Sequence, residues 1–246
     1  MSENYSRPAI KGLTRYILLM VSVSLITPLL NAQTNSAAAT VFVDLNKSAG
    51  QMNAAWAWFG HDEPNYTYMK DGKKLLSELA ALSPVPVYMR VHNLLTSGDG
   101  TPALKWGSTN AYTEDADGHP IYNWNIIDSI FDTYIKLGIK PLAQIGFMPE
   151  ALSTRPQPYK HNWKPGDRYG DIYTGWAYPP KDYNKWRELV YQWVKHCVSR
   201  YGKQQVESWY WEVWNEPNFY WKGPMEDFFK LYDYAAEGLK QALPSA

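Results

Sequence analysis

The sequence predicts an α/β fold in which four strand–helix units follow one another around a parallel sheet of the barrel type. Short apolar runs alternate with stretches of helical periodicity, and this alternation implies parallel strands joined by right-handed helical crossovers. The two longest loops, residues 92–123 and 147–181, both follow strand ends, which is where barrel enzymes place their sites. No glycine-rich phosphate fingerprint follows the first strand, which argues against a doubly wound dinucleotide-binding sheet. We therefore favour the barrel.

The first unit combines a short strand with an amphipathic helix. The strand is predicted at residues 54–59, an apolar run that closes on Gly60. The helix begins near Asp71, and its apolar positions recur at helical spacing: Leu75, Leu76, Leu79 and Leu82. Pro84 and Pro86 then end the helix, because proline cannot continue the helical hydrogen bonding.

The second unit follows directly. Residues 87–91 (VYMRV) predict a strand, and apolar residues at helical spacing predict a helix over residues 126–137. Gly138 ends this helix, as glycine commonly does at a helix C-terminus. The third strand is predicted at residues 142–146 (LAQIG).

The third and fourth units complete the pattern. The clearest periodicity runs over residues 182–201, where an apolar stripe repeats at three- and four-residue intervals, and Gly202 ends the helix. Residues 209–214 (WYWEVW) predict the fourth strand, and the apolar spacing over residues 228–239 predicts the fourth helix.

The composition is that of a globular protein with balanced charge. The chain has 246 residues, of which 45% are hydrophobic and 20% charged, and this suffices to bury the core of one domain. Lys and Arg total 24, as do Asp and Glu, so there is no basic excess to hold a nucleic-acid backbone or an anionic membrane surface. We expect no nucleic-acid partner and no cofactor.

Aromatic residues are unusually frequent, with 12 Trp and 19 Tyr. Such rings can fill a core, and they can also form a surface that packs against the C–H faces of sugar rings. Composition alone leaves both interpretations open for any single ring.

Residues 1–32 are predicted to be a secretory signal peptide. An uncharged apolar run at residues 16–30 follows three basic residues, Arg7, Lys11 and Arg15. A transmembrane anchor is the alternative, but the run is shorter than the ~20 residues that a span needs, and Pro28 interrupts its end. Cleavage after Ala32 or Ala39 would release a secreted or periplasmic protein without stable membrane insertion.

The strongest sign of chemistry is the tripeptide Asn215-Glu216-Pro217 at the end of the fourth predicted strand. Its aromatic neighbours are expected to crowd the Glu216 carboxyl and raise its pKa, and a carboxyl group that stays protonated near neutrality can act as a general acid. Pro217 disfavours the helical region for the residue before it and so stiffens the turn. Taken alone, such a tripeptide is more often a solvated loop with a strand-terminating proline.

Four short segments together carry a more specific pattern. They are Arg90-Val91-His92, Ile145-Gly146-Phe147-Met148-Pro149, Pro179-Pro180-Lys181-Asp182-Tyr183 and Glu212-Val213-Trp214-Asn215-Glu216-Pro217-Asn218. In order and spacing, they resemble glycoside hydrolase family 39, which includes β-xylosidases and is related to α-L-iduronidases. The resemblance covers roughly residue 41 to the end. It implies a retaining glycoside hydrolase, β-xylosidase-like and acting on plant-type oligosaccharides, with the fold of a partial (β/α)8 TIM barrel comprising the first four β/α units.

The resemblance also implies roles for individual residues. The glutamate of the family's Asn-Glu-Pro motif is the proton donor, which assigns the general acid/base role to Glu216. By the same resemblance, Asn215 binds the 2-hydroxyl of the cleaved sugar. His92 contacts that sugar, and Phe147 lines the pocket. For His92 the alternative is a satisfied polar group at a strand end, and Phe147 could be plain core.

Other side chains are expected to support this site. Among the aromatic residues of the long loops, Trp176 is a candidate for substrate binding, with Trp163 and Tyr178 as further candidates for the walls of outer sugar subsites. Arg90 is expected to orient neighbouring carboxylates without necessarily touching the sugar.

The length of the chain bears on the mechanism. A retaining enzyme needs a second carboxylate about 5 Å from the first to act as nucleophile. In the resembled family that residue comes from strand seven, so we expect it to be missing here. Residues 54–246 would then be the first half of a catalytic barrel, truncated after helix four and inactive alone. Residues 33–53 would form an N-terminal segment in which residues 41–45 could be an accessory β-strand.

Two polar clusters invite comparison with metal sites. Residues 61–63 (HDE) are adjacent in a loop and should point in different directions. Asp115 and Asp117 before Gly118 echo a calcium loop but lack its bidentate glutamate, so a polar turn is the better interpretation. We predict no metal at either place.

Other functions remain possible from sequence alone. A non-catalytic carbohydrate-binding protein would keep the aromatic residues without needing a pair of carboxylates. A glycosidase of other specificity could act on an arabinoside, galactoside or uronide. An esterase or metal hydrolase on the same fold is disfavoured, because the sequence lacks a Gly-x-Ser-x-Gly elbow and a His-Glu-x-x-His helix.

Overall fold

The computed structural model of the protein describes residues 39–246, which fall into two units, one up to residue 51 and one over residues 52–246. The predicted signal peptide, residues 1–32, lies outside the described residues. Residues 39–51 are exposed and contain a turn in which the Lys47 amide donates to the Asp44 carbonyl oxygen at 3.3 Å. Residues 41–45 form no strand, because no backbone ladder within residues 39–246 pairs with them.

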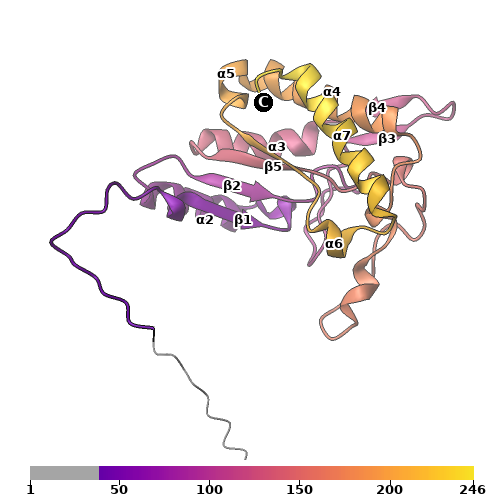
Figure 1. Ribbon diagram of the computed structural model, residues 1–246. Helices are drawn as coiled ribbons and strands as arrows, with labels where there is room; N and C mark the ends of the chain where they lie inside the picture. The colour runs from indigo at the N-terminus through magenta and orange to yellow at the C-terminus, as the bar shows by residue number, and fades with distance from the viewer. Residues whose placement is uncertain (1–38) are drawn as a thin grey trace, which may run out of the picture. The chain divides into compact units, whose positions relative to one another are not determined.

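Residues 52–246 fold around a parallel sheet, as the sequence predicts (Figure 1). In order across the sheet, its strands are β1 (Trp58–His61), β2 (Tyr88–Val91), β5 (Lys140–Ile145) and β6 (Tyr210–Val213). The register places Arg90 beside Leu142, and Leu142 beside Tyr210. Because the strands are parallel, their carboxyl ends share one edge of the sheet, and the residues that follow them meet there.

Long helices follow each strand and confirm the alternation read from the sequence. They are α2 (Lys70–Leu82), α3 (Asn125–Lys136), α4 (Tyr183–Tyr201) and α7 (Met225–Ala242). Asp182 caps α4, because its carboxylate accepts from the amides of Asn184 and Lys185 at 2.8 and 3.2 Å. Gly202 ends α4 with a φ of 85°, which glycine adopts without strain. Two short helices, α5 (Lys203–Val206) and α6 (Pro217–Tyr220), flank β6.

Two further parts of the chain differ from the sequence prediction. The first strand was expected at residues 54–59, but Ala55–Ala57 form a 3-10 turn and β1 begins at Trp58. Its start is set by pairing with Tyr88, the first residue of β2, and this partner is not encoded in the local apolar run. The expected loop over residues 92–123 contains a short antiparallel hairpin, whose strands are β3 (Tyr112–Glu114) and β4 (Pro120–Tyr122).

The sheet is buried on one face and open on the other. Side chains that point toward the helices are buried: Met89, Val91, Ala143 and Ile145. They belong to the same core as the large helix residues Phe131, Trp186 and Trp193. Because side chains alternate along a strand, the opposite face presents Tyr88, Arg90, Tyr210 and Glu212, which are half-buried or exposed, while Gln144 on this face is buried.

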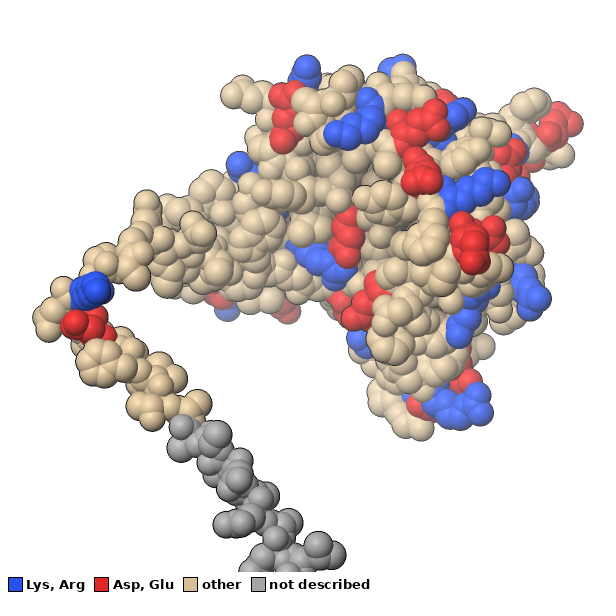
Figure 2. Space-filling view, in the orientation of Figure 1, with Lys and Arg blue, Asp and Glu red and all other residues tan. Residues whose placement is uncertain are grey.

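The surface carries both signs of charge. On the face drawn in Figure 2, acidic and basic groups are interspersed over residues 52–246. No helix in the described part of the chain is long and apolar enough to span a membrane.

Candidate active site

The site is organised around Arg90 on the open face of β2. Its Nε and Nη2 donate to the two carboxylate oxygens of Glu212 on β6, each at 2.6 Å. This two-point geometry fixes the plane of the guanidinium group, as bidentate arginine–carboxylate pairs do. Arg90 therefore orients a carboxylate, as the sequence suggests, and that carboxylate belongs to Glu212.

Arg90 also brings two of the predicted site residues together. Its Nη2 donates to Asn215 Oδ1 at 2.7 Å, and its Nη1 donates to His92 Nε2. His92 directly follows β2 and Asn215 lies two residues beyond β6, so both stand at the shared carboxyl edge of the sheet. One cation thus holds an imidazole and an amide from two different strands.

His92 is a neutral hydrogen-bond acceptor in this arrangement. Its side chain is buried, and burial together with the adjacent Arg90 charge lowers its pKa to about 4. Because Nε2 accepts from Arg90, the ring proton sits on Nδ1, which faces Asp62 Oδ1 at 3.6 Å. Both ring nitrogens therefore face protein groups, and the ring edge packs against Phe147 with centroids 6.5 Å apart.

The turn that carries Glu216 is held from several sides. Trp214 is fully buried. Its amide donates to the Ile145 carbonyl oxygen at 3.1 Å, and its Nε1 donates to the Tyr220 carbonyl oxygen at 3.0 Å. Trp214 and Glu216 both have positive φ, 67° and 42°, a conformation that is uncommon for residues other than glycine. The Glu216 carbonyl oxygen accepts from the Tyr220 amide at 2.8 Å, which starts α6.

The Glu216 side chain differs from the sequence expectation in one respect. It is exposed, whereas its aromatic neighbours were expected to crowd it. The physical reason is that Pro217 begins α6 immediately, which leaves Glu216 on an open turn at the N-cap of that helix. The Glu216 carboxylate nevertheless interacts electrostatically with two nearby tyrosines. Burial raises the pKa of both Tyr173 and Tyr220, and the Glu216 carboxylate adds to the increase.

Aromatic rings build one wall of the site. Phe147 follows β5, and its ring centroid lies 4.4 Å from Trp176 and 4.9 Å from Trp214. Trp176 is buried, and its Nε1 donates to the Ile172 carbonyl oxygen at 3.0 Å. The Tyr169 and Tyr220 hydroxyls are hydrogen-bonded, which ties the long loop after β5 to α6.

A hollow, here called the site hollow, opens between these groups. Its lining residues are Asp62, His92, Asn93, Lys105, Trp106, Phe147, Tyr169, Ile172, Trp176, Asn215 and Tyr220. Four predicted site residues are among them: Asn215, His92, Phe147 and Trp176. Glu216 follows Asn215 directly and is not part of the lining, and neither are Trp163 and Tyr178.

Sequence reasoning missed Asp62, Lys105, Tyr169 and Tyr220 as lining residues. The signal for Asp62 is its place directly after the first strand, whereas the sequence pattern suggests only a metal cluster at residues 61–63. In the structure His61 turns away from Asp62 and Glu63, which contact different atoms of one residue, Lys105. His61 bonds the Tyr134 hydroxyl at 2.7 Å, Asp62 pairs with Lys105 at 3.0 Å, and Glu63 accepts from the Lys105 amide at 2.8 Å.

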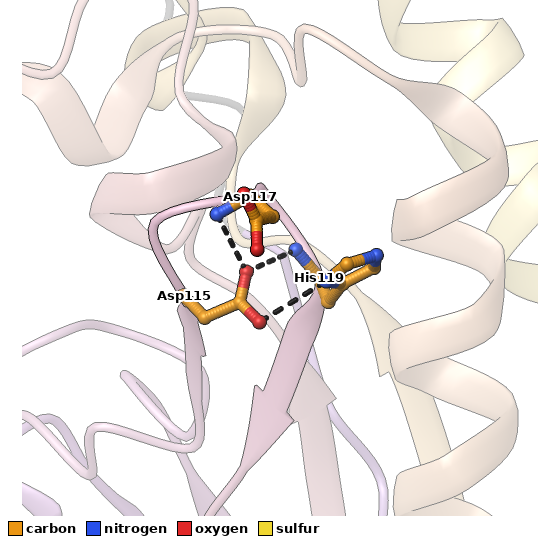
Figure 3. A group of neighbouring side chains, drawn as sticks. All are labelled: Asp115, Asp117 and His119. Carbon is orange, nitrogen blue, oxygen red and sulfur yellow. Dashed lines mark hydrogen bonds and ion pairs between the residues drawn. The ribbon is translucent and has the colours of Figure 1, made fainter.

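The second polar cluster forms the turn of the β3–β4 hairpin (Figure 3). Asp115 Oδ1 accepts from the amides of Asp117 and His119 at 2.9 and 2.8 Å, and its Oδ2 lies 3.1 Å from His119 Nδ1. All three residues are exposed. The carboxylate thus organises the backbone of a polar turn, which is the role predicted for it.

Comparison with known proteins gives consistent results. A family model, Glycosyl hydrolases family 39, matches residues 39–246. A β-xylosidase from Caldicellulosiruptor saccharolyticus is 32% identical over 205 residues, which are 82% of this chain and 38% of that protein. A β-xylosidase from Geobacillus stearothermophilus is 38% identical over 163 residues, which are 64% of this chain and 28% of that protein.

Solved structures show the same relation. The crystal structure of a monomeric β-xylosidase from Caulobacter crescentus superimposes with a TM-score of 0.60 and 31% identity, over 76% of this chain and 34% of that chain. The chain therefore spans well under half the length of the relatives that it matches.

Proposed function

Because the chain belongs to glycosyl hydrolase family 39, we propose that it carries the acid/base part of a retaining glycosidase that acts on β-xylosides of plant-type oligosaccharides. The β-xylosidase relatives support xylose as the sugar that is released, and membership of the family supports glycoside hydrolysis as the class of reaction. We further propose that its four β/α units are the first half of a (β/α)8 barrel. The open sheet face supports this, since a doubly wound sheet would be covered by helices on both faces.

The observation that carries the proposal is the anchored turn after β6. Arg90 fixes Asn215 Oδ1, which leaves the amide nitrogen of Asn215 to donate to the 2-hydroxyl of a sugar in the site hollow. Glu216 follows on a turn held by Trp214 and can present its carboxyl to the glycosidic oxygen. In this proposal Glu216 protonates the leaving group and then deprotonates the incoming water.

The other predicted residues have supporting roles in this proposal. His92, held neutral by burial and by the adjacent Arg90 charge, and Phe147 shape the side of the hollow against which the sugar lies. Trp176, predicted to bind substrate, packs against the Phe147 ring and lines the same hollow, where it adds to the apolar wall against the sugar. The N-terminal segment, residues 1–32, directs the protein to a secreted or periplasmic location.

A retaining reaction needs a nucleophile opposite the acid/base. Glu212 shares both its oxygens with Arg90, and Asp62 shares Oδ2 with Lys105, so each of these carboxylates already has a partner on another strand or loop. We propose that the nucleophile lies outside residues 1–246, in the part of the protein that corresponds to the remaining length of its relatives.

The test is the stereochemistry of hydrolysis by the full-length gene product. Proton NMR of 4-nitrophenyl β-D-xylopyranoside hydrolysis should show the β-anomer of xylose first, with the α-anomer appearing only by mutarotation. The α-anomer as first product would rule out retention. Absence of hydrolysis of any aryl glycoside would contradict the proposed activity itself.

A further inference from the structure

Asp62 and Lys105 form a charged pair in the wall of the site hollow that the proposed acid/base chemistry does not use. Lys105 Nζ lies 3.0 Å from Asp62 Oδ2. The Lys105 side chain is 33% exposed and the Asp62 side chain 48%, so a ligand in the hollow could reach both. They come from different strand-end loops, since Asp62 follows β1 and Lys105 lies in the loop after β2.

The loop holds Lys105 in a fixed position. Its amide donates to Glu63 Oε1 at 2.8 Å, and its carbonyl oxygen accepts from His161 Nε2 at 2.7 Å. Its φ of 54° is uncommon for a residue with a side chain, and such conformations persist where the surrounding contacts impose them. The backbone of Lys105 is thus clamped from both sides, which is more than a solvated lysine requires.

Asp62 is equally well placed, and one of its oxygens is free to accept. The Asn93 side chain donates to the Asp62 carbonyl oxygen at 3.0 Å. Oδ2 takes the Lys105 ammonium, whereas Oδ1 lies 3.6 Å from His92 Nδ1, which is longer than a hydrogen bond. Oδ1 therefore keeps lone pairs for a donor from a ligand.

The charges in this wall are balanced. Among the residues that line the hollow, Lys105 is the only lysine or arginine, and Asp62 neutralises it. Arg90, behind the lining, is likewise paired with Glu212. A sugar carboxylate placed here would meet the Asp62 carboxylate without an unpaired cation among the lining residues, whereas hydroxyl groups would find an acceptor and a donor side by side.

We propose that Asp62 and Lys105 are specificity-determining residues that bind two neighbouring ring hydroxyls of an uncharged sugar, Asp62 as acceptor and Lys105 as donor, and that the pair disfavours uronides. This inference rests on the proposed glycosidase function and deepens it, because it names the substrate class. It predicts that replacing either residue lowers kcat/KM only for substrates that carry the bound hydroxyl groups.

The experiment compares Asp62→Asn and Lys105→Met with the wild-type full-length gene product. Substrates are 4-nitrophenyl β-D-xylopyranoside and its 2-, 3- and 4-deoxy analogues. A hydrogen bond to a charged group corresponds to roughly 10- to 100-fold in kcat/KM, so each variant should lose about that much on the parent xyloside. The loss should vanish on the deoxy analogue that lacks the bound hydroxyl, a pattern that a merely structural role would not produce.

Two further measurements complete the test. The glucoside and the glucuronide of 4-nitrophenol differ only in that the glucuronide carries a carboxylate in place of the hydroxymethyl group. Asp62→Asn should lower the ratio of kcat/KM on the β-D-glucoside to kcat/KM on the β-D-glucuronide. Asp117→Asn in the β3–β4 turn and Lys74→Met on α2, both exposed, serve as matched controls and should leave every kcat/KM within twofold. An equal loss on all deoxy analogues, or no loss on the parent xyloside, would overturn the inference.

Failure of the proposed function would be seen separately. If the wild type hydrolyses no aryl glycoside, that function is wrong, and binding of free xylose measured by saturation-transfer NMR then decides the role of the pair. Loss of the xylose signal in Asp62→Asn would sustain the inference, and an unchanged signal would refute it.

Discussion

Arg90 and Glu212 are joined by two N–H···O bonds of 2.6 Å, although β5 separates their strands. The planar guanidinium group matches both carboxylate oxygens. Its Nη2, which donates to Glu212, also donates to Asn215 Oδ1, and its Nη1 donates to His92. The position of the Asn215 amide therefore depends on a carboxylate three residues earlier in the chain.

Replacing Glu212 by Gln tests this dependence. A neutral amide cannot accept both N–H groups, so Arg90 should lose its fixed plane and Asn215 its alignment. We expect kcat/KM of the full-length gene product on an aryl xyloside to fall about 5- to 30-fold. The thermal midpoint should change little, because the pair is about one-third exposed and is screened by solvent.

Glu237→Gln provides the control for this variant. Glu237 also pairs with an arginine, Arg187 at 3.1 Å, but on the helices α7 and α4 rather than on the sheet. Activity should be unchanged in the control. An equal loss of activity in both variants would show that Glu212 acts through general stability and not through Arg90.

The local parts of the fold could be predicted from sequence because their causes are local. The start of α4 follows from Asp182, whose carboxylate caps the helix, and its end follows from Gly202. The start of β1 could not be predicted, since it is set by pairing with Tyr88, thirty residues later in the chain. The β3–β4 hairpin was hidden because strands of three residues leave almost no periodicity to detect.

The candidate site divides in the same way. Asn215 and Glu216 stand in one contiguous motif, so both could be predicted as site residues from the sequence alone. The Asp62–Lys105 pair joins residues far apart in the chain, and no local pattern relates a lysine in a loop to an aspartate after another strand. The exposure of Glu216 was also unpredictable, because it depends on α6 beginning at Pro217.

The ionisation of His92 gives a prediction about pH. Its pKa in the folded protein is lowered to about 4 from 6.5, so between these pH values the unfolded chain binds a proton that the folded chain does not. Stability therefore rises with pH through this window and is lost as the pH falls from 6.5 toward 4. The contribution has an upper limit of roughly 3 kcal/mol.

Thermal midpoints of the full-length gene product between pH 4 and 7 check this prediction. Wild type should lose more stability than His92→Gln as the pH falls, because the variant lacks the titrating group. His119→Gln, on the exposed hairpin turn, should follow the wild type. Identical pH slopes for wild type and His92→Gln would refute the assignment of a neutral, buried His92.

The Tyr169–Tyr220 contact predicts a role for the long loop after β5. Tyr169→Phe removes the hydroxyl group that ties the loop to α6, so the loop should open more often and be cut faster by trypsin. KM for an aryl xyloside should rise a few-fold with kcat little changed. Tyr232→Phe on the exposed side of α7 is the control. Equal cleavage rates in both variants would show that the Tyr169–Tyr220 hydrogen bond does not hold the loop to α6.

The acid/base role proposed for Glu216 leads to a prediction that separates this role from simple binding. In the full-length gene product, Glu216→Ala should slow xylobiose hydrolysis by about two to four orders of magnitude, because an alkoxide leaving group needs a proton. The 2,4-dinitrophenyl xyloside should react almost normally in its first step, because its leaving group departs without protonation. Release of the sugar should then become slow, since no base activates the water, and azide should restore turnover by intercepting the glycosyl-enzyme as β-xylosyl azide. Equal losses on both substrates, without rescue by azide, would mean that Glu216 contributes binding alone and that another residue supplies the proton.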